Sequence, residues 1–289
     1  MAQSFQGWKL YWLDNASTDE EYAAMLGILR EVDPKFEIVR ERVLENIGFA
    51  GGHEQLYQMH DAEYVVLLND DAILGSEYFA ELMAVLDMNP RFGAVEGVIL
   101  RWHFDNAGEV VKTDTVDTIG LRCGWSQKVQ DIAAGETFSM MTMPDPVWKM
   151  AVRGVDEVFG VSGCLPMYRR SVIGEQLFDP AYFFYKEDVD VAYRIREKGF
   201  VSATVYAALA YHQRSFKKSL LHLRASYAQE FCSYRNHLWN LRKHVTRRDW
   251  FRYGVFIAGF EMVKAGFMLL KHPTIVWKVW RDLLKATSN

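Results

Sequence analysis

Two acidic clusters and one histidine are the side chains in this sequence best suited to chemistry on a charged substrate. The first cluster, Asn69-Asp70-Asp71, follows the apolar run from Tyr64 to Leu68. The second, Glu187-Asp188-Val189-Asp190, follows three aromatic residues, and His212 lies farther along the chain. Carboxylate oxygens are the ligands that hard divalent cations prefer, and a carboxylate beside a hydrophobic wall is suited to general base catalysis. These residue types therefore favour a metal site and a proton acceptor.

Each of these features also has a structural interpretation that needs no ligand. Asp70 and Asp71 could simply end a strand and cap a helix, which we expect over residues 73–90. The acids from Glu187 to Asp190 could simply stabilise the start of a helix, predicted over residues 188–198, through the helix dipole. A lone histidine such as His212 is commonly structural. Taken one at a time, the clusters leave both interpretations open.

The elements that must position these residues alternate between strand and helix. Short apolar runs predict strands, and apolar residues at spacings of three and four predict helices; the strands are expected near residues 9–13, 36–40, 64–68, 93–100 and 201–206. Such alternation is typical of an α/β domain with a mostly parallel sheet flanked by helices. Ligands of such sheets bind at the carboxyl ends of the strands, where the first cluster lies. Residues 101–158 are less regular, and we expect a long excursion over the site.

Polar residues and glycines follow the first two predicted strands as well. Asp14-Asn15-Ala16-Ser17-Thr18-Asp19 comes after the first, and Asn46-Ile47-Gly48-Phe49-Ala50-Gly51-Gly52 after the second. Glycines let a backbone approach a ligand closely, and a helix that begins near Gly52 would point its amino end at an anion. Turn formation and helix capping are the alternative for Asp14 and Asp19.

Composition and charge divide the chain into two regions. Its 289 residues, half of them hydrophobic, are enough for one large α/β domain with an appendage, here residues 1–212 and 213–289. The second region has 15 Lys and Arg against 4 Asp and Glu, whereas the first has 18 against 33. A basic tail suggests an anionic partner. With no nucleic-acid motif and an acidic body, we expect no nucleic-acid partner.

The basic region is expected to be helical and to reach a membrane surface. A long helix is predicted to end near His244, and two more, separated by Pro273, carry Trp277 and Trp280 among basic residues. Trp and basic residues on amphipathic helices suit a membrane interface. The alternative is packing on the body or on a second subunit, which would make the chain a homodimer.

Other features of the sequence favour a cytoplasmic location on the inner face of the cell membrane. We find no run of 18 apolar residues and no apolar core in residues 1–7, so neither a membrane span nor a signal peptide is expected. The three cysteines are far apart and show neither a disulfide framework nor zinc spacing, which fits a reducing compartment.

The order of these motifs resembles that of a known family. Four of the motifs are those already described, at residues 14–19, 46–52, 67–71 and 211–212; the other two are Ser162-Gly163-Cys164 and Tyr185-Lys186-Glu187-Asp188-Val189-Asp190. Over residues 8–244 the chain is similar to family 2 glycosyltransferases of the GT-A fold, closest in pattern to the rhamnosyltransferase-like branch. Members of that family begin with an earlier strand, loop and helix, and the resemblance implies that this unit is absent from the present sequence.

The resemblance implies a role for each motif. Asp188 would be the general base, with Glu187 as its neighbour, and Asp71 would be the metal-binding acid, supported by His212. Asp14 would read the nucleobase of the donor. The remaining residues of the expected donor site are Asn15, Asp19, Asn46, Gly48, Gly51, Gly52, Asn69 and Asp70.

The implied activity is inverting transfer of a sugar, rhamnose-like or another hexose. The donor would be a dTDP- or UDP-linked sugar with Mg²⁺ or Mn²⁺, and the acceptor a lipid-linked or polysaccharide chain in cell-surface glycan synthesis. A cation neutralises the diphosphate leaving group while a carboxylate takes the proton of the acceptor hydroxyl. The alternative is a catalytically impaired relative that serves as a binding or scaffold subunit. It rests on the absent first unit and on Glu54, where the family usually has Asn.

Overall fold

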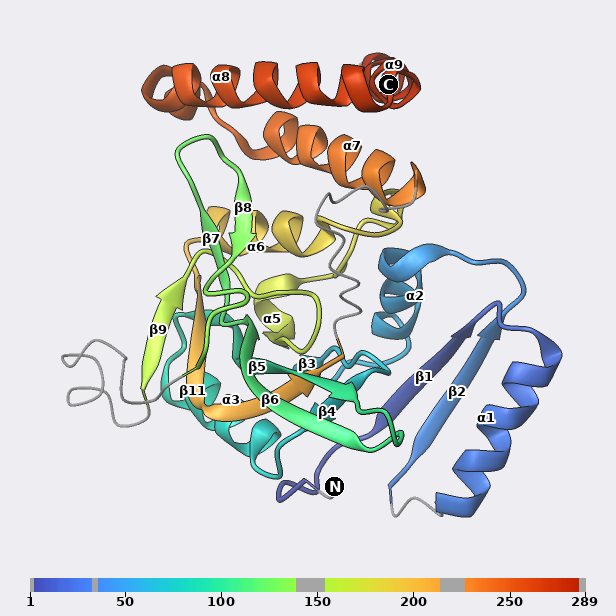
Figure 1. Ribbon diagram of the computed structural model, residues 1–289. Coiled ribbons are helices and arrows are strands. Elements are labelled where there is room, and N and C mark those ends of the chain that lie inside the picture. The colour runs from blue at the N-terminus through green and yellow to red at the C-terminus, as the bar shows by residue number, and fades with distance from the viewer. Residues whose placement is uncertain (1–2, 33–35, 139–153, 214–226, 286–289) are drawn as a thin grey trace.

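The body of the protein is built around β5 (Phe92–Phe104), whose first nine residues are all buried. The computed structural model describes residues 3–32, 36–138, 154–213 and 227–285. A mixed sheet with helices on its sides forms the body, and three helices near the carboxyl end lie in layers beyond it (Figure 1). The expected α/β class with a helical appendage is confirmed.

The main sheet has seven strands, and most neighbouring pairs in it are antiparallel. The order is β3-β10-β5-β11-β4, with β6 on β5 and β9 on β11. Among its described pairs, only β5 and β11 run parallel. The bounds are β3 (Tyr64–Val66), β4 (Ala72–Leu74), β6 (Val110–Thr118), β9 (Val155–Val158), β10 (Met167–Arg169) and β11 (Val201–His212). The prediction of a mostly parallel sheet is therefore wrong here, because antiparallel strands form in segments predicted otherwise: β4 in a predicted helix, and β6 and β9 in the predicted excursion.

A separate two-stranded sheet carries the first part of the chain. β1 (Leu10–Asn15) and β2 (Ile38–Val43) pair in parallel, joined by α1 (Asp19–Val32), and α2 (Gly48–Tyr57) follows. Among the described strands, β1 is hydrogen-bonded only to β2, and β3 only to β10. The predicted alternation of strand and helix is confirmed for this region, although α2 begins four residues before Gly52.

The helix predicted over residues 73–90 is wrong in its first part. Ile73 and Leu74 pair with Tyr211 and Ala210 of β11, so they form β4, and α3 (Tyr78–Met88) starts only after Gly75. A Cβ on Gly75 would lie 2.6 Å from the Leu209 carbonyl oxygen, so only glycine allows the chain to pass there. Pairing with a long central strand outweighed local helix propensity in this segment.

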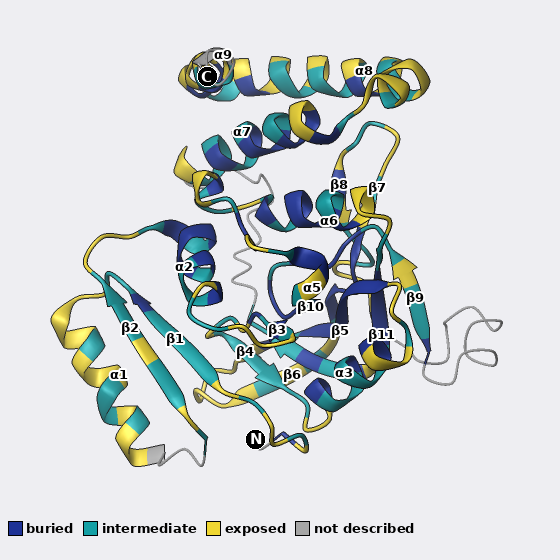
Figure 2. Cartoon of the chain, turned by 180° about the vertical axis from the view of Figure 1, so that it is seen from behind, coloured by how far each residue is buried: buried dark blue, intermediate teal, exposed yellow. Residues whose placement is uncertain are grey.

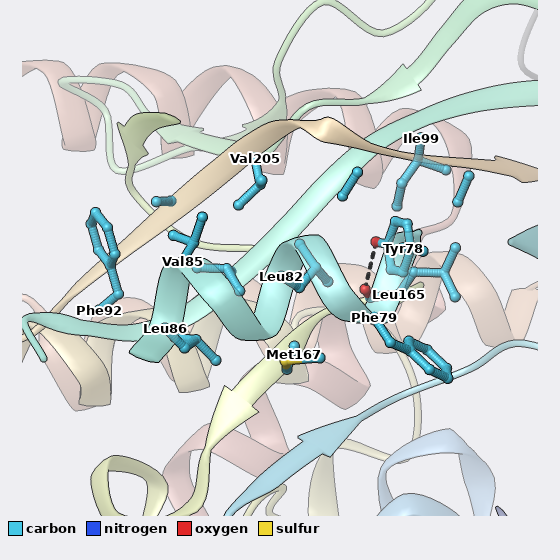
Figure 3. Close-up of a cluster of buried hydrophobic side chains, with 14 of the residues drawn as sticks. Tyr78, Phe79, Leu82, Val85, Leu86, Phe92, Ile99, Leu165, Met167 and Val205 are labelled. Carbon is cyan, nitrogen blue, oxygen red and sulfur yellow. Dashed lines mark hydrogen bonds between the residues drawn. The ribbon is translucent and has the colours of Figure 1, made fainter. Parts of the chain in front are cut away.

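The core between α3 and the sheet packs against the two central strands, β5 and β11. Leu82, Val85 and Leu86 of α3 are almost fully buried against β5 and β11, as Figure 3 shows. The Tyr78 hydroxyl donates to the Leu165 carbonyl at 2.9 Å. Truncating a buried leucine such as Leu82 to alanine typically costs about 2–5 kcal/mol, so this core is a rigid base for the site.

Residues 101–158, predicted as a less regular excursion, contain strands as well as loops. Besides β6 and β9, this segment forms the hairpin β7 (Leu121–Cys123) and β8 (Val129–Asp131); residues 139–153 lie outside the described part. The hairpin rises from the body toward the carboxyl-terminal helices (Figure 1).

Six further helical segments lie in the described part of the chain. They are α5 (Arg170–Ile173), the 3-10 turn η1 (Pro180–Tyr182), α6 (Glu187–Glu197), α7 (Tyr227–His244), α8 (Arg247–Lys271) and α9 (Pro273–Lys285). The break at Pro273 and the helix at residues 188–198 are confirmed, the latter within one residue. α7 lies over α6, and α8 with α9 forms the outermost layer (Figure 1).

Candidate active site

The turn between β3 and β4 presents the first acidic cluster with its backbone firmly held. The Trp102 indole and the Gln213 amide both donate to the Asp71 carbonyl, at 2.9 and 3.0 Å. The Asn69 Oδ1 atom is buried and has no hydrogen-bond partner, and the buried Asp71 Oδ1 atom faces His212. Leaving a buried acceptor unpaired costs about 1–3 kcal/mol, so the Asn69 oxygen is poised here for a ligand that the described residues do not supply. Asp70 beside them is exposed.

His212 lies directly opposite this turn because the antiparallel ladder of β4 and β11 pairs it with Ala72. Its Nε2 is 3.0 Å from Asp71 Oδ1, and its Nδ1 is 2.8 Å from Asp117 Oδ2. Burial lowers the pKa of His212, but the hydrogen bonds to Asp117 and Asp71 outweigh it and raise the pKa to about 12. The structure thus brings Asp71 and His212 together as predicted.

Asp117, from β6, was not predicted, and it completes a carboxylate-histidine arrangement. Its side chain is buried, and its second oxygen lies 3.3 Å from Arg101 Nε. A carboxylate on the far nitrogen of a metal-binding histidine typically fixes the orientation of the ring. No sequence motif marked this residue, because only the pairing of β6 with β5 brings it to the site.

The Asp71 and His212 side chains could hold a divalent cation as two protein ligands once the cation displaces the proton between them. Two ligands about 2.1 Å from a metal at a right angle would be about 3.0 Å apart, the separation found between Nε2 and Oδ1. Over the described ranges, no group of three or more His, Cys, Asp or Glu side chains could hold a metal. A cation here would therefore take its other ligands from a bound substrate and water.

The second acidic cluster forms the amino end of α6. Asp188 accepts hydrogen bonds from the Gly163 amide at 3.3 Å and the Val189 amide at 2.8 Å, so the predicted Ser162-Gly163-Cys164 turn contacts the base candidate. Glu187 is buried, and its Oε2 has no hydrogen-bond partner. Asp188 keeps some solvent access, which a base that meets a substrate requires.

The pKa values of this acid pair are shifted toward neutrality. Burial, followed by the charge of Asp188, raises the pKa of Glu187 to about 8. Burial also raises the pKa of Asp188, although Lys186 opposes the shift. A general base works best when its pKa lies near the operating pH. Simple helix capping would lower these pKa values, so their direction favours the catalytic interpretation.

The loop before the acid pair is strained, and α7 holds it from above. Phe183, Tyr185 and Lys186 all have positive φ, between 63° and 69°, which costs about 1–3 kcal/mol per residue. The Asn236 amide nitrogen lies within hydrogen-bonding distance of the Tyr182, Phe184 and Tyr185 carbonyls, at 2.7–3.0 Å. The Asn240 amide donates to the Lys186 carbonyl at 3.0 Å. Neither asparagine belongs to a motif, so sequence reasoning missed both.

Asp190, the last acid of the cluster, joins α6 to α7. It is buried and bonded to His244, Lys243 and Arg194 at 2.7–2.9 Å. Burial would raise its pKa, but the hydrogen bonds from His244 and Lys243 hold it well below its usual range. Asp190 is therefore a charged structural tie, unlike its two neighbours.

The residues expected at the donor form a connected network after β1 and β2. Arg42 binds both Asp14 and Asp19, at 2.9 and 2.8 Å. Asn15 accepts from the Ile47 amide, and Asn46 accepts from the Gly48 amide. The network brings Asp14, Asn15, Asp19 and Asn46 together at one end of the parallel pair. Their role in donor binding remains a prediction.

The predicted glycine turn serves mainly close packing. Gly48 has a φ of +78°, and a Cβ there would lie 2.4 Å from the Phe183 carbonyl oxygen, which accepts from the Ala50 amide. Gly51 and Gly52 are buried in the first turn of α2, against Ile47 and Leu13. The first turn of α2 therefore packs on the strained loop before Glu187. The Ile47, Gly48 and Ala50 amides already have protein acceptors, contrary to the expected free amino end near Gly52.

Glu54 has protein partners that account for its charge. Its Oε2 accepts from the Leu177 and Phe178 amides, both at 2.9 Å, and its Oε1 accepts from Gln58. A carboxylate satisfied in this way has a structural role in α2. Glu54 therefore gives no support to the idea of an impaired donor site.

Comparisons with known proteins agree with this geometry. The model of the family described as "Glycosyltransferase like family 2" matches residues 3–236. No curated protein matches the chain. Among solved structures, one described as "Crystal structure of GalNAc-T7 with UDP, GalNAc and Mn2+" has a TM-score of 0.59 and 12% sequence identity. The match covers 81% of this chain and 41% of that one, so this chain spans less than half of its length. The likeness shows a shared GT-A fold.

Proposed function

Because the chain belongs to the glycosyltransferase like family 2 and is a glycosyltransferase, we propose that it is an inverting, metal-dependent hexosyltransferase. The donor is a nucleotide-diphosphate sugar, and the acceptor is a lipid-linked or polysaccharide chain of the cell envelope. One observation carries the proposal: the Asp71–His212 pair, next to the unpartnered Asn69 oxygen, lies on the same fold as a buried acid pair with raised pKa values.

Asp71 and His212 would hold Mg²⁺ or Mn²⁺, with Asn69 adjacent. When bound, such a cation neutralises charge on the diphosphate leaving group. Asp117 keeps the His212 ring aligned through its 2.8 Å contact with Nδ1. Trp102 keeps the Asp71 backbone in place.

Asp188 takes the proton of the acceptor hydroxyl. The acceptor oxygen forms a bond to the anomeric carbon while the bond from that carbon to the diphosphate oxygen breaks. The proton moves to an Asp188 carboxylate oxygen, and the nucleoside diphosphate leaves with the electron pair. A single displacement of this kind inverts the anomeric centre and needs no covalent nucleophile. Burial keeps Asp188 basic, because it raises the pKa of that carboxyl.

The donor pocket is proposed at Asp14, Asn15, Asp19 and Asn46, where the end of β1 meets the turn before α2. UDP-linked sugars are the first donors to test, since the GalNAc-T7 structure was described with UDP, and dTDP-linked sugars, including rhamnose, are the second. We further propose that the enzyme works at the cytoplasmic face of the cell membrane, where a lipid-linked acceptor would be found.

Turnover of nucleotide sugars by the full chain tests this function. Release of nucleoside diphosphate from a panel of UDP- and dTDP-sugars is measured with Mn²⁺, with Mg²⁺ and with a chelator. We expect metal-dependent release from at least one donor and none from Asp188→Asn. Metal-independent release, or full activity of the variant, would contradict the mechanism.

A further inference from the structure

The helix α8 has the opposite orientation to a surface helix of a water-soluble protein, because its apolar face is directed outward. The charged residues in its second half face the protein: Glu261 bonds to His237 at 2.6 Å, and Lys264 lies 5.0 Å from the Tyr234 ring centre. Lys271 pairs with Glu230. A helix packed on a soluble body normally places its apolar stripe inward and its charges outward, so the arrangement here needs a partner on the outer side.

The outer face of α8 is apolar over almost its full length. Five of its side chains are at least 70% exposed, namely Phe251 (96%), Val255 (85%), Met262 (71%), Val263 (75%) and Leu270 (90%). Of the residues from 251 to 270 that are exposed, only Arg252 is charged. Val255 and Leu270 are about 22 Å apart along the helix axis. A continuous apolar surface of this size marks an interaction site; Figure 2 shows exposed residues along α8.

Aromatic and basic residues surround this apolar face. Trp277 (72% exposed) and Trp280 (52%) stand on α9 beside exposed Lys278 and Arg281. Trp125, at the tip of the β7–β8 hairpin and 67% exposed, lies with its ring centre 5.2 Å from that of Phe256. Exposed Arg247 and Arg248 stand at the first turn of α8. Tryptophan and basic side chains around an apolar centre match the layers of an anionic bilayer surface.

We propose that this outer face, formed by α8, Trp277, Trp280 and Trp125, docks flat on the surface of an anionic lipid bilayer. The basic side chains, Arg247, Arg248, Arg252, Lys278 and Arg281, are complementary in charge to lipid phosphates. They oppose the pairing of two copies through the same face, because like charges would meet. This inference rests on the proposed function only in that the bilayer would supply a lipid-linked acceptor.

The geometry favours a helix that lies on the membrane over one that crosses it. α8 is long and apolar enough to span a bilayer, and only 11% of its most apolar 18-residue stretch is buried. Glu261 and Lys264 interrupt this stretch, so it contains no uninterrupted apolar run of spanning length. Crossing would separate these residues from α7 and place charges in hydrocarbon, at about 2.5–3.5 kcal/mol each. Docking flat keeps every one of these contacts.

The docked orientation also connects the membrane to the proposed base. The β7–β8 hairpin carries Trp125 at its tip, and its Val129 carbonyl accepts from the Lys186 side chain at 3.2 Å. Leu121 and Val129 of the same hairpin pack on Val189 of α6. One hairpin thus reaches from the docking face to the start of α6, where Asp188 would meet an acceptor presented by the bilayer.

Vesicle co-sedimentation of the full chain tests the docking face. We expect the wild type to pellet with phosphatidylcholine vesicles that contain phosphatidylglycerol, and much less with phosphatidylcholine alone. Val263→Glu with Leu270→Glu should reduce the pelleted fraction at least tenfold. The matched control is Leu44→Glu with Met88→Glu, at side chains 88% and 62% exposed elsewhere on the molecule, and it should pellet like the wild type. Circular dichroism verifies the fold of all variants.

Several outcomes overturn the inference. One is full vesicle binding by the Val263→Glu, Leu270→Glu variant. Another is a wild-type protein that stays in the supernatant with both kinds of vesicle. If the wild type does not bind vesicles but forms dimers that the Val263→Glu, Leu270→Glu double substitution disrupts, this face is an interface between copies. Metal-dependent nucleotide binding, measured on the same samples, separates the two proposals. If nucleotide binding fails while vesicle binding persists, the proposed function falls and the docking face stands.

Discussion

The two halves of the candidate site, around Asp71 and around Asp188, differ in how far contacts within the protein already hold their side chains. On the Asp71 side, the buried Asn69 oxygen has no partner, and His212 Nε2 lies 3.0 Å from Asp71 Oδ1. On the Asp188 side, the carboxylate already accepts two amide hydrogen bonds, and asparagines from α7 hold the preceding loop. The first half is arranged to receive a ligand, whereas the second is preorganised before any ligand arrives. Binding and proton transfer should therefore be separable by mutation.

The largest expected effect is the loss of turnover in Asp188→Asn. The variant keeps the size of the side chain but removes the proton acceptor, and general base catalysis is worth about 10²–10⁴-fold. Donor affinity should stay within a few fold, because the other half of the site is intact. Steady-state turnover and nucleotide titration measure the two quantities. Asp61→Asn, at an exposed position, is the control. If Asp188→Asn turned over as fast as this control, Asp188 would not be the general base.

Asp117→Ala should weaken the binding half alone. Without the Oδ2 contact, the His212 ring loses its fixed orientation, and partners of this kind typically contribute about 10–100-fold to metal affinity. Activity titrated with Mn²⁺ should show a higher half-saturation concentration, with turnover largely restored at saturating metal. An unchanged Mn²⁺ curve would show that His212 needs no such support.

Asn236→Ala should impair the base half alone. The substitution removes hydrogen bonds to three carbonyls next to a strained loop, and unpaired buried groups cost about 1–3 kcal/mol. We expect kcat to fall roughly tenfold, following the tenfold-per-1.4 kcal/mol relation, with the KM for the donor unchanged. Asn106→Ala, on an exposed turn, controls for the loss of an amide. A rise in the KM for the donor at constant kcat would show that Asn236 supports the ligand-binding half, contrary to this prediction.

Glu187→Gln should shift the pH dependence with a smaller effect on maximal turnover. Glu187, with a pKa of about 8, is protonated at neutral pH and adds a negative charge beside Asp188 only at higher pH. The basic side of the kcat/KM profile should therefore change in the variant, while the acidic limb stays in place. The raised pKa of Glu187 has a second consequence: its contribution to stability is present below pH 4.5 and is lost as pH rises through about 8. The variant should therefore gain Tm over the wild type across that interval; equal profiles and equal melting would contradict the coupling.

Much of this organisation was predictable from local pattern, and the rest depended on contacts between distant segments. The short strand before Asn69 and the helix near Asp188 follow from apolar runs and capping residues. The same pattern predicted Ile73 as helical, because only the presence of β11 makes it a strand. Asp117, Asn236 and Asn240 carry no local signature either. They reach the site through strand pairing and helix docking, which no spacing along the chain encodes.

The outward face of α8 shows a further limit of local pattern. Glu261 and Lys264 interrupt its apolar stretch and suggest a solvated helix face. In the structure, Glu261 hydrogen-bonds to His237 of α7, and Lys264 lies over the ring of Tyr234 of the same helix. Which side of a helix faces solvent depends on what packs against it, so periodicity alone predicted the helix but not its orientation.

Calorimetric titration of UDP and dTDP with Mn²⁺ into three forms of the full chain tests the separation of the two halves most directly. We predict metal-dependent binding of one nucleotide to the wild type and to Asp188→Asn, and none to Asp71→Ala. Equal binding to wild type and Asp71→Ala, or loss of binding in Asp188→Asn, would contradict the division of the site into a ligand-binding half and a preorganised base.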